Sequence, residues 1–216
     1  MIAILVLGVF SKPSSAHETA PPGQSIVRDV VPIQVGDPIP QTMFMDQDGK
    51  PFRFSKLRGK TVLVSFIYTR CPDPRECPLI SANFHGVQKR IGAGPFALVE
   101  VTLDPKEDTP ARLRAYGRQF EANPADWTFL TGAEASIFDF AAKFDVSRFD
   151  DPTRGVIHND RTVLIDPHGR IDTFIDETGW SPDGVYAQMR NQRRVIQSRS
   201  EAGPASIERL CRIVWQ

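Results

Sequence analysis

Uncharged apolar runs alternate along the chain with segments whose apolar residues recur every three or four positions. The run 61–68 (TVLVSFIY) carries no charge and is rich in β-branched residues, which predicts a strand buried on both faces. A helical pattern over 78–91 follows it, with Pro78 suited to the first turn and Gly92 suited to the end. The rest of the chain is predicted to be organised around this strand–loop–helix unit.

The remaining segments continue the alternation of strands and helices. Further strands are predicted at 96–103, 127–130, 161–166 and 170–175, and further helices at 109–121, 135–144 and 181–196. Short strand signals between 39 and 57 predict a β-hairpin ahead of the main sheet, and a polar loop is expected to lead to His158. The order predicts an α/β, thioredoxin-like fold, with a central mixed sheet, helices on both faces and an N-terminal β-hairpin extension.

Four regions are expected in a chain of 216 residues. Residues 1–16 resemble a signal peptide, because an apolar run too short to span a bilayer leads to the small residues Ser-Ser-Ala, although no basic residues precede it. The expected order is a signal peptide at 1–16, a Pro-rich linker at 17–35, a thioredoxin-like domain at 36–197 and an Arg-rich extension at 198–216. We therefore expect export to the periplasm or cell envelope, whether the N-terminus is cleaved or kept as a membrane anchor.

The net charge and the cysteine content limit the functions that the chain can have. The 26 basic and 26 acidic residues cancel, so no net charge attracts the protein to nucleic acid. Of the three cysteines, two lie close together and Cys211 lies near the C-terminus. In an oxidising compartment two neighbouring cysteines tend to form a disulfide.

Cys71 and Cys77 lie between the buried strand and the helix that follows it. A helix N-terminus favours the thiolate, the form that attacks disulfides and binds soft metals such as Cu(I). Five residues separate the two cysteines, and the segment contains prolines that stiffen it, which favours a ligand clasp over rapid exchange. A metal held by two thiolates needs at least one more ligand. His158 is the best-placed candidate, just before the strand at 161, where thioredoxin-like enzymes usually have a proline.

Three blocks resemble the Sco/SenC family: FIYTRCPDPRECP, VTLDPKEDTPARLRAY and HNDRTVLIDPHGRI. The resemblance covers roughly residues 36–196. It implies a copper-binding thioredoxin fold that helps to assemble the dinuclear copper centre of cytochrome c oxidase, with Cys71, Cys77 and His158 as the copper ligands. The family's usual spacing is Cys-x3-Cys, whereas this chain has Cys-x5-Cys.

Several functions are compatible with these residues. The first hypothesis is an exported copper-binding accessory protein, not an enzyme, that passes copper to a receiving protein such as a cytochrome c oxidase subunit. The alternative is a thiol–disulfide oxidoreductase, in which Cys71 and Cys77 are catalytic. Two further hypotheses remain. One is a peroxiredoxin-like peroxidase that uses Thr69, and the other is an interaction module in which Cys71 and Cys77 form a structural disulfide. Asp104 is expected only to end its strand.

Overall fold

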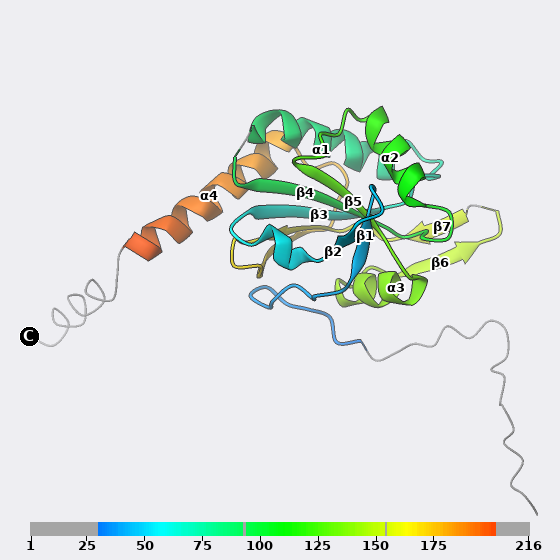
Figure 1. Ribbon diagram of the computed structural model, residues 1–216, viewed down its shortest axis with the longest axis horizontal. Coiled ribbons are helices and arrows are strands. Elements are labelled where there is room, and N and C mark those ends of the chain that lie inside the picture. The colour runs from blue at the N-terminus through cyan, green and yellow to red at the C-terminus, as the bar shows by residue number, and fades with distance from the viewer. Residues whose placement is uncertain (1–29, 93, 154, 202–216) are drawn as a thin grey trace, which may run out of the picture.

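A seven-stranded sheet forms the centre of the molecule (Figure 1). The computed structural model describes residues 30–92, 94–153 and 155–201. The sheet has the order β2-β1-β5-β4-β3-β8-β9. Its strands are β1 (Phe44–Asp46), β2 (Pro51–Phe52), β3 (Thr61–Ile67), β4 (Phe96–Thr102), β5 (Trp127–Thr131), β8 (Thr162–Ile165) and β9 (Ile171–Ile175). Strands β3, β4 and β5 are parallel, whereas β8 runs antiparallel to β3. The predicted mixed α/β sheet is confirmed.

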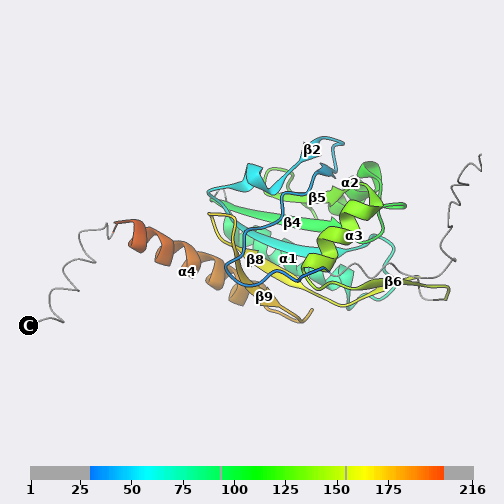
Figure 2. The ribbon, with the colours of Figure 1, turned by 90° about the horizontal axis from the view of Figure 1, so that it is seen from below.

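Helices cover both faces of this sheet. They are α1 (Cys77–Ile91), α2 (Pro110–Gln119), α3 (Glu134–Lys143) and α4 (Pro182–Glu201), and a short 3-10 helix, η1 (Phe54–Leu57), precedes β3. Helices α1 and α4 pack against each other on one face, and α3 lies on the opposite face (Figure 2). The N-terminal hairpin of β1 and β2 joins the sheet through β5.

Strand β3 is the most central element. All seven of its residues are buried, and it pairs with β4 on one side and β8 on the other. The uncharged run in the sequence is thus explained, because both faces of the strand contact helices and neither meets water. Its carboxyl end leads directly into the segment that contains both cysteines.

Aromatic side chains fill the space on both faces of the sheet. On the α3 face, the rings of Phe44 and Phe140 lie 4.9 Å apart and those of Phe66 and Phe144 lie 5.6 Å apart. On the other face, Trp127 stacks on Phe129 at 5.2 Å, and Phe84 of α1 packs against Trp127. Dense packing of large rings makes the sheet a rigid support for the loops at its edge.

The segment before β8 differs from the sequence prediction. In place of a polar loop, β6 (Arg148–Asp151) and β7 (Gly155–His158) pair as an antiparallel hairpin in a sheet of their own. The polar-loop prediction was wrong because the strands are four residues each and mostly exposed or half-buried, so they give little hydrophobic signal. His158 is the last residue of β7, and the hairpin therefore fixes its position.

The ends of two helices also differ from expectation. Helix α1 begins at Cys77, one residue earlier than predicted, and α4 continues to Glu201, past the predicted end at 196. No helix-breaking residue occurs before Gly203, so α4 crosses the boundary expected after residue 197. The expected signal peptide, residues 17–29 of the linker and residues 202–216 lie outside the described residues.

Candidate metal centre

The cysteine loop, residues 68–76, connects the end of β3 to the start of α1. Its turns are closed by main-chain hydrogen bonds, in which the Cys71 N–H donates to the Tyr68 carbonyl at 3.3 Å and the Glu76 N–H donates to the Asp73 carbonyl at 3.2 Å. The Asp73 carboxylate also accepts from the Arg75 main-chain N–H at 2.9 Å and from its guanidinium at 2.8 Å. The loop is thus a series of tight turns, as expected of a Pro-Asp-Pro sequence.

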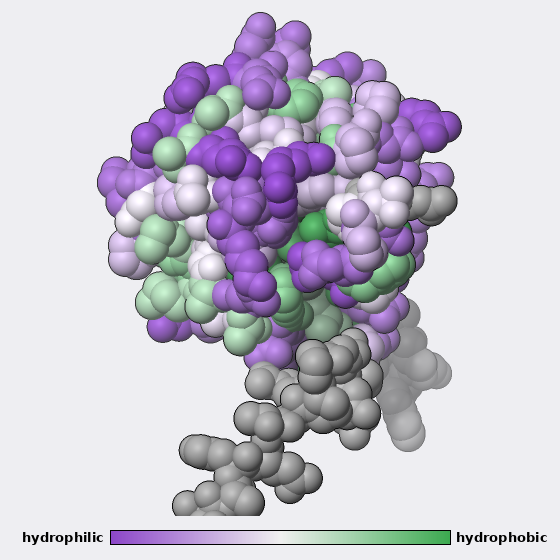
Figure 3. All heavy atoms as spheres, turned by 90° about the vertical axis from the view of Figure 1, so that its right-hand side faces the viewer, coloured by the Kyte–Doolittle hydropathy of each residue, from purple (hydrophilic) through white to green (hydrophobic). Residues whose placement is uncertain are grey.

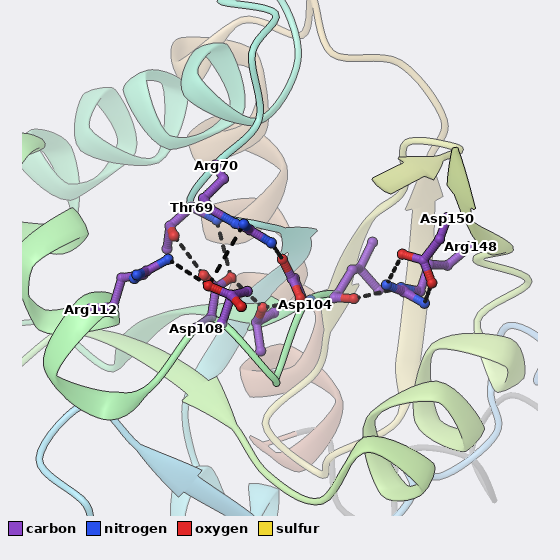
Figure 4. A network of polar contacts seen from close by, with 10 residues as sticks. Thr69, Arg70, Asp104, Asp108, Arg112, Arg148 and Asp150 are labelled. Carbon is purple, nitrogen blue, oxygen red and sulfur yellow. Dashed lines mark hydrogen bonds and ion pairs between the residues drawn. The ribbon is translucent and has the colours of Figure 1, made fainter. Parts of the chain in front are cut away.

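Asp108 anchors the base of this loop (Figure 4). Its buried carboxylate accepts hydrogen bonds from the Thr69 hydroxyl at 2.5 Å, the Thr69 N–H at 3.1 Å and the Thr102 hydroxyl at 2.5 Å. Nearby, Arg70 donates to Asp104 at 2.7 Å. Asp104 therefore does more than end its strand, because it also holds the residue next to Cys71.

Cys77 and His158 meet although they are 81 residues apart, with the Cys77 Sγ and the His158 Nε2 at 3.5 Å. The His158 Nδ1 lies 3.1 Å from the Asn159 carbonyl oxygen. Because a carbonyl oxygen only accepts, Nδ1 carries the ring proton and Nε2 presents its lone pair to Cys77. Burial lowers the pKa of His158, which keeps the ring neutral at neutral pH. The ring also packs edge-on against Tyr68, with centroids 5.8 Å apart.

The two thiols are free and differ in environment. Cys77 is fully buried, whereas Cys71 is half-buried. A hydrogen bond from the Cys77 thiol is the main cause that lowers the pKa of Cys71 to about 6. The same contact, together with burial, raises the pKa of Cys77 well above its usual range. Cys71 therefore ionises before Cys77.

Cys71 and His158 both line one cleft at the surface. The cleft has a volume of about 530 Å³ and is lined by Tyr68, Cys71, Pro72, Asp73, Glu76, Thr153, Val156, Ile157 and His158. Seen from the end of the molecule that carries the hairpin, apolar side chains lie in a hollow surrounded by polar ones (Figure 3). An ion or a small partner group thus has access to Cys71 and His158 from solvent.

Cys77 and His158 are spaced as two ligands of one metal ion would be, but the described residues do not form a complete metal site. Within the described part of the chain, no three His, Cys, Asp or Glu side chains are grouped so that they could hold an ion. Yet with metal–sulfur and metal–nitrogen bonds of about 2.3 and about 2.0 Å, typical of tetrahedral sites, the 3.5 Å between Cys77 Sγ and His158 Nε2 corresponds to an angle of about 110° at a shared ion. Cys71 lines the same cleft as His158 and is the remaining donor of the predicted set.

A pair of carboxyl groups near the site was missed by sequence reasoning. Burial first, and then the neighbouring carboxyl of Glu76, raise the pKa of Asp160 to about 7. One Asp160 oxygen is buried with no hydrogen-bond partner among the described residues. No local pattern in the sequence links Glu76 to a residue 84 positions later.

A second missed feature lies beneath α1. Glu100 of β4 is fully buried and accepts a hydrogen bond from Ser81 at 2.9 Å. Ser81 also contacts the Tyr116 hydroxyl at 2.9 Å, and Tyr116 donates to the Cys77 carbonyl at 3.5 Å. A chain of polar groups therefore connects a buried acid to the first residue of α1.

Of the three residues singled out in the sequence, Cys71 and His158 line one cleft, and the buried Cys77 contacts the His158 ring. Cys211 lies outside the described residues. A central mixed sheet in which a dithiol loop joins a buried strand to a helix defines a thioredoxin-like protein. The sequence profile of the SCO1/SenC family matches residues 39–193, and the chain belongs to this family.

Individual relatives agree with this assignment. The chain is 33% identical over 158 residues to a SCO2-like protein of Rickettsia conorii, covering 68% of this chain and 73% of the relative. It is 29% identical over 147 residues to the SCO1 protein homolog of Bacillus subtilis, covering 64% and 75%. Among solved structures, a SCO1/SenC family lipoprotein from Bacillus anthracis has a TM-score of 0.65 at 26% identity, covering 72% and 95%. Copper-bound ScoI from Bradyrhizobium japonicum has a TM-score of 0.61 at 25% identity, covering 74% and 99%.

Proposed function

We propose that this protein binds one copper ion through Cys71, Cys77 and His158 and delivers it to a copper protein such as the copper centre of cytochrome c oxidase. The observation that supports this most directly is the 3.5 Å contact between Cys77 Sγ and His158 Nε2, beside a cleft into which Cys71 also opens. The copper-bound structure of a relative, ScoI of Bradyrhizobium japonicum, supports the choice of metal.

The donor set suits Cu(I). Thiolate sulfur and imidazole nitrogen are soft or intermediate donors, which favour Cu(I) over hard cations. His158 is held neutral with its Nε2 lone pair facing Cys77, and Cys71 is largely ionised at neutral pH. Binding then requires release of one further proton, from the Cys77 thiol, so affinity increases with pH.

Copper titration of the reduced protein tests the proposal. In the presence of a competing Cu(I) chelator, we expect one copper ion per chain, and a loss of affinity of at least tenfold in both His158→Ala and Cys71→Ala. His85→Ala is the matched control, because His85 on α1 contacts Glu121 at 3.7 Å and does not line the cleft. Tight binding that persists in both ligand variants contradicts the proposal.

A thiol–disulfide oxidoreductase is the second candidate, and the lowered pKa of Cys71 beside a second thiol favours it. In that function the Cys71 thiolate attacks a partner disulfide, which forms a mixed disulfide and releases the first partner thiolate. Cys77, after losing its proton, then attacks the Cys71 sulfur, releases the second partner thiolate and closes the Cys71–Cys77 disulfide. Rapid exchange with a disulfide substrate by the copper-free protein, together with negligible copper uptake, supports this alternative over copper transfer.

Export to the cell envelope is the final part of the proposal. The apolar residues 2–10 and the Ser-Ser-Ala sequence support it, as does the relative described as a lipoprotein from Bacillus anthracis. Across the described residues, none of the helices combines the length and hydrophobicity needed to span a bilayer. N-terminal sequencing of the protein from cell-envelope fractions is expected to show cleavage after Ala16, and an intact N-terminus in a soluble cytoplasmic fraction contradicts it.

A further inference from the structure

A second cleft continues the one that contains Cys71. It has a volume of about 340 Å³ and is lined by Tyr68, Arg70, Pro72, Asp104, Asp150, Thr153, Gly155 and Val156. Four of these residues, Tyr68, Pro72, Thr153 and Val156, also line the first cleft. The two clefts therefore form one groove, which runs between the cysteine loop and the β6–β7 hairpin.

One wall of this groove is the edge of a strand. Within the part of the chain that the structure describes, β7 pairs with β6 alone. Val156, Ile157 and His158 all line the first cleft, although successive side chains of a strand point to opposite faces. The strand therefore presents its edge to the groove, and alternate residues of an edge strand direct their N–H and C=O groups outward. Such an edge is a template for an added strand.

The described residues that line the groove include more carboxylates than cations. Four carboxylates, those of Asp73, Glu76, Asp104 and Asp150, line the two clefts, compared with one cation, Arg70. Three of these carboxylates are paired with arginines: Asp104 with Arg70 at 2.7 Å, Asp73 with Arg75 at 2.8 Å and Asp150 with Arg148 at 2.6 Å. Glu76 forms no ion pair within the described chain. A segment that enters the groove is therefore favoured if it carries positive charge next to the unpaired carboxylate of Glu76.

We propose that the groove binds an extended, positively charged segment of a partner protein, which adds to the edge of β7 as a third strand of the hairpin sheet. At about 3.3 Å per residue, the four residues of β7 pair with about four residues of the partner. A cysteine in that segment then lies beside Cys71. This last feature rests on the proposed copper transfer, whereas the strand addition does not.

A synthetic peptide tests the strand addition on the reduced, copper-free protein. The probe is a fluorescein-labelled eight-residue peptide in which valine and lysine alternate around a central cysteine, and binding is measured by fluorescence anisotropy. We expect binding that weakens at least tenfold when all internal amides are N-methylated, because strand pairing needs their N–H groups. A peptide with glutamate in place of lysine is also expected to bind at least tenfold more weakly. Equal binding of the N-methylated peptide overturns the proposal.

Two variants of the hairpin locate the binding surface. Ile157 and Phe149 are cross-strand partners, but Ile157 lines the groove and Phe149 is exposed and lines neither cleft. Ile157→Lys is expected to weaken peptide binding at least tenfold, and Phe149→Lys by less than twofold, with thermal melts to show that both variants fold. Equal losses in the two variants would place peptide binding on the face of the hairpin, and would overturn the proposal that the peptide binds in the groove.

The two proposals fail separately. Peptide binding is measured without copper, and copper titration of the wild-type protein is measured without peptide. Absence of peptide binding by a protein that takes up one copper ion refutes the strand addition and leaves the proposed function intact. Peptide binding by a protein that takes up no copper refutes the proposed function and leaves the strand-addition proposal intact.

Discussion

At the scale of single residues, the difference in burial between Cys71 and Cys77 assigns their roles. Cys71 is half-buried at the cleft, and Cys77 is enclosed at the first turn of α1. A shared hydrogen bond concentrates the ionisation on the accessible sulfur, since it lowers the pKa of Cys71 and raises that of Cys77. The Cys71 sulfur is therefore the one that is accessible from the cleft, and under the proposed function it is the first to contact copper.

Alkylation of the reduced protein measures this asymmetry. Cys71 is expected to react with iodoacetamide with a midpoint near pH 6, whereas Cys77 stays unmodified in the folded protein because it is buried. Cys77→Ala removes the main cause of the lowered pKa and is expected to raise the midpoint for Cys71. Peptide mapping by mass spectrometry separates the three cysteines, and an unchanged midpoint in Cys77→Ala contradicts this account.

Prediction from the sequence succeeded at this scale where the signal was local. Cys71 and Cys77 could be identified because a buried strand, a proline-containing loop and a helix start lie next to one another. His158 was placed by its position before β8 and by family resemblance. The pairing of Glu76 with Asp160 was not predictable, because it depends on how a loop and a distant strand meet in the folded protein.

At the scale of elements, the cysteine loop is held from outside rather than by its own contacts alone. Thr69 at its start is bound through both its hydroxyl and its main-chain N–H by the buried carboxylate of Asp108, which precedes α2. The block VTLDPKEDTP therefore contributes to the site by support, although it supplies none of the proposed ligands.

Removing this support is expected to destabilise the fold. Asp108→Ala leaves the hydroxyls of Thr69 and Thr102 without their buried acceptor, and we expect a loss of about 2–4 kcal/mol in the free energy of unfolding. Glu107→Ala is the matched control, because its exposed ion pairs contribute less than about 1 kcal/mol. Urea unfolding measures both, and equal losses in the two variants would falsify the anchoring role of Asp108.

The hairpin of β6 and β7 shows where element prediction fails. The long buried strands β3 and β4 were predicted to within one residue, because their apolar runs are strong signals. Strands of four half-exposed residues have no such run, and their pairing becomes favourable only once the body of the protein positions both ends.

At the scale of the whole molecule, one buried acid links folding to pH. Burial raises the pKa of Glu100 from its ordinary value of 4.5 to about 8. Between these two values the unfolded chain is ionised and the folded protein is protonated at this residue, so folding takes up a proton. The contribution of Glu100 to the free energy of unfolding is therefore complete below about pH 4.5 and decreases as the pH rises toward 8.

Glu100→Gln tests this linkage, because the amide has nearly the same shape and does not ionise. The wild-type protein is expected to lose up to about 1.4 kcal/mol per pH unit from this residue between pH 5 and pH 8, and the variant is expected to show a flatter profile. Glu107→Gln, on the exposed surface, is expected to leave the profile unchanged. Unfolding free energies at several pH values measure the difference, and parallel profiles for wild type and Glu100→Gln contradict the buried-acid account.

The separation of β6 and β7 from the main sheet has a mechanical consequence. The sulfurs belong to the rigid body of the molecule, whereas His158 belongs to a small lever whose main-chain ladder is independent of that body. A displacement of this hairpin relative to the main sheet changes the distance between the His158 nitrogen and the Cys77 sulfur. A partner that binds the hairpin is therefore expected to change how strongly the proposed site holds copper.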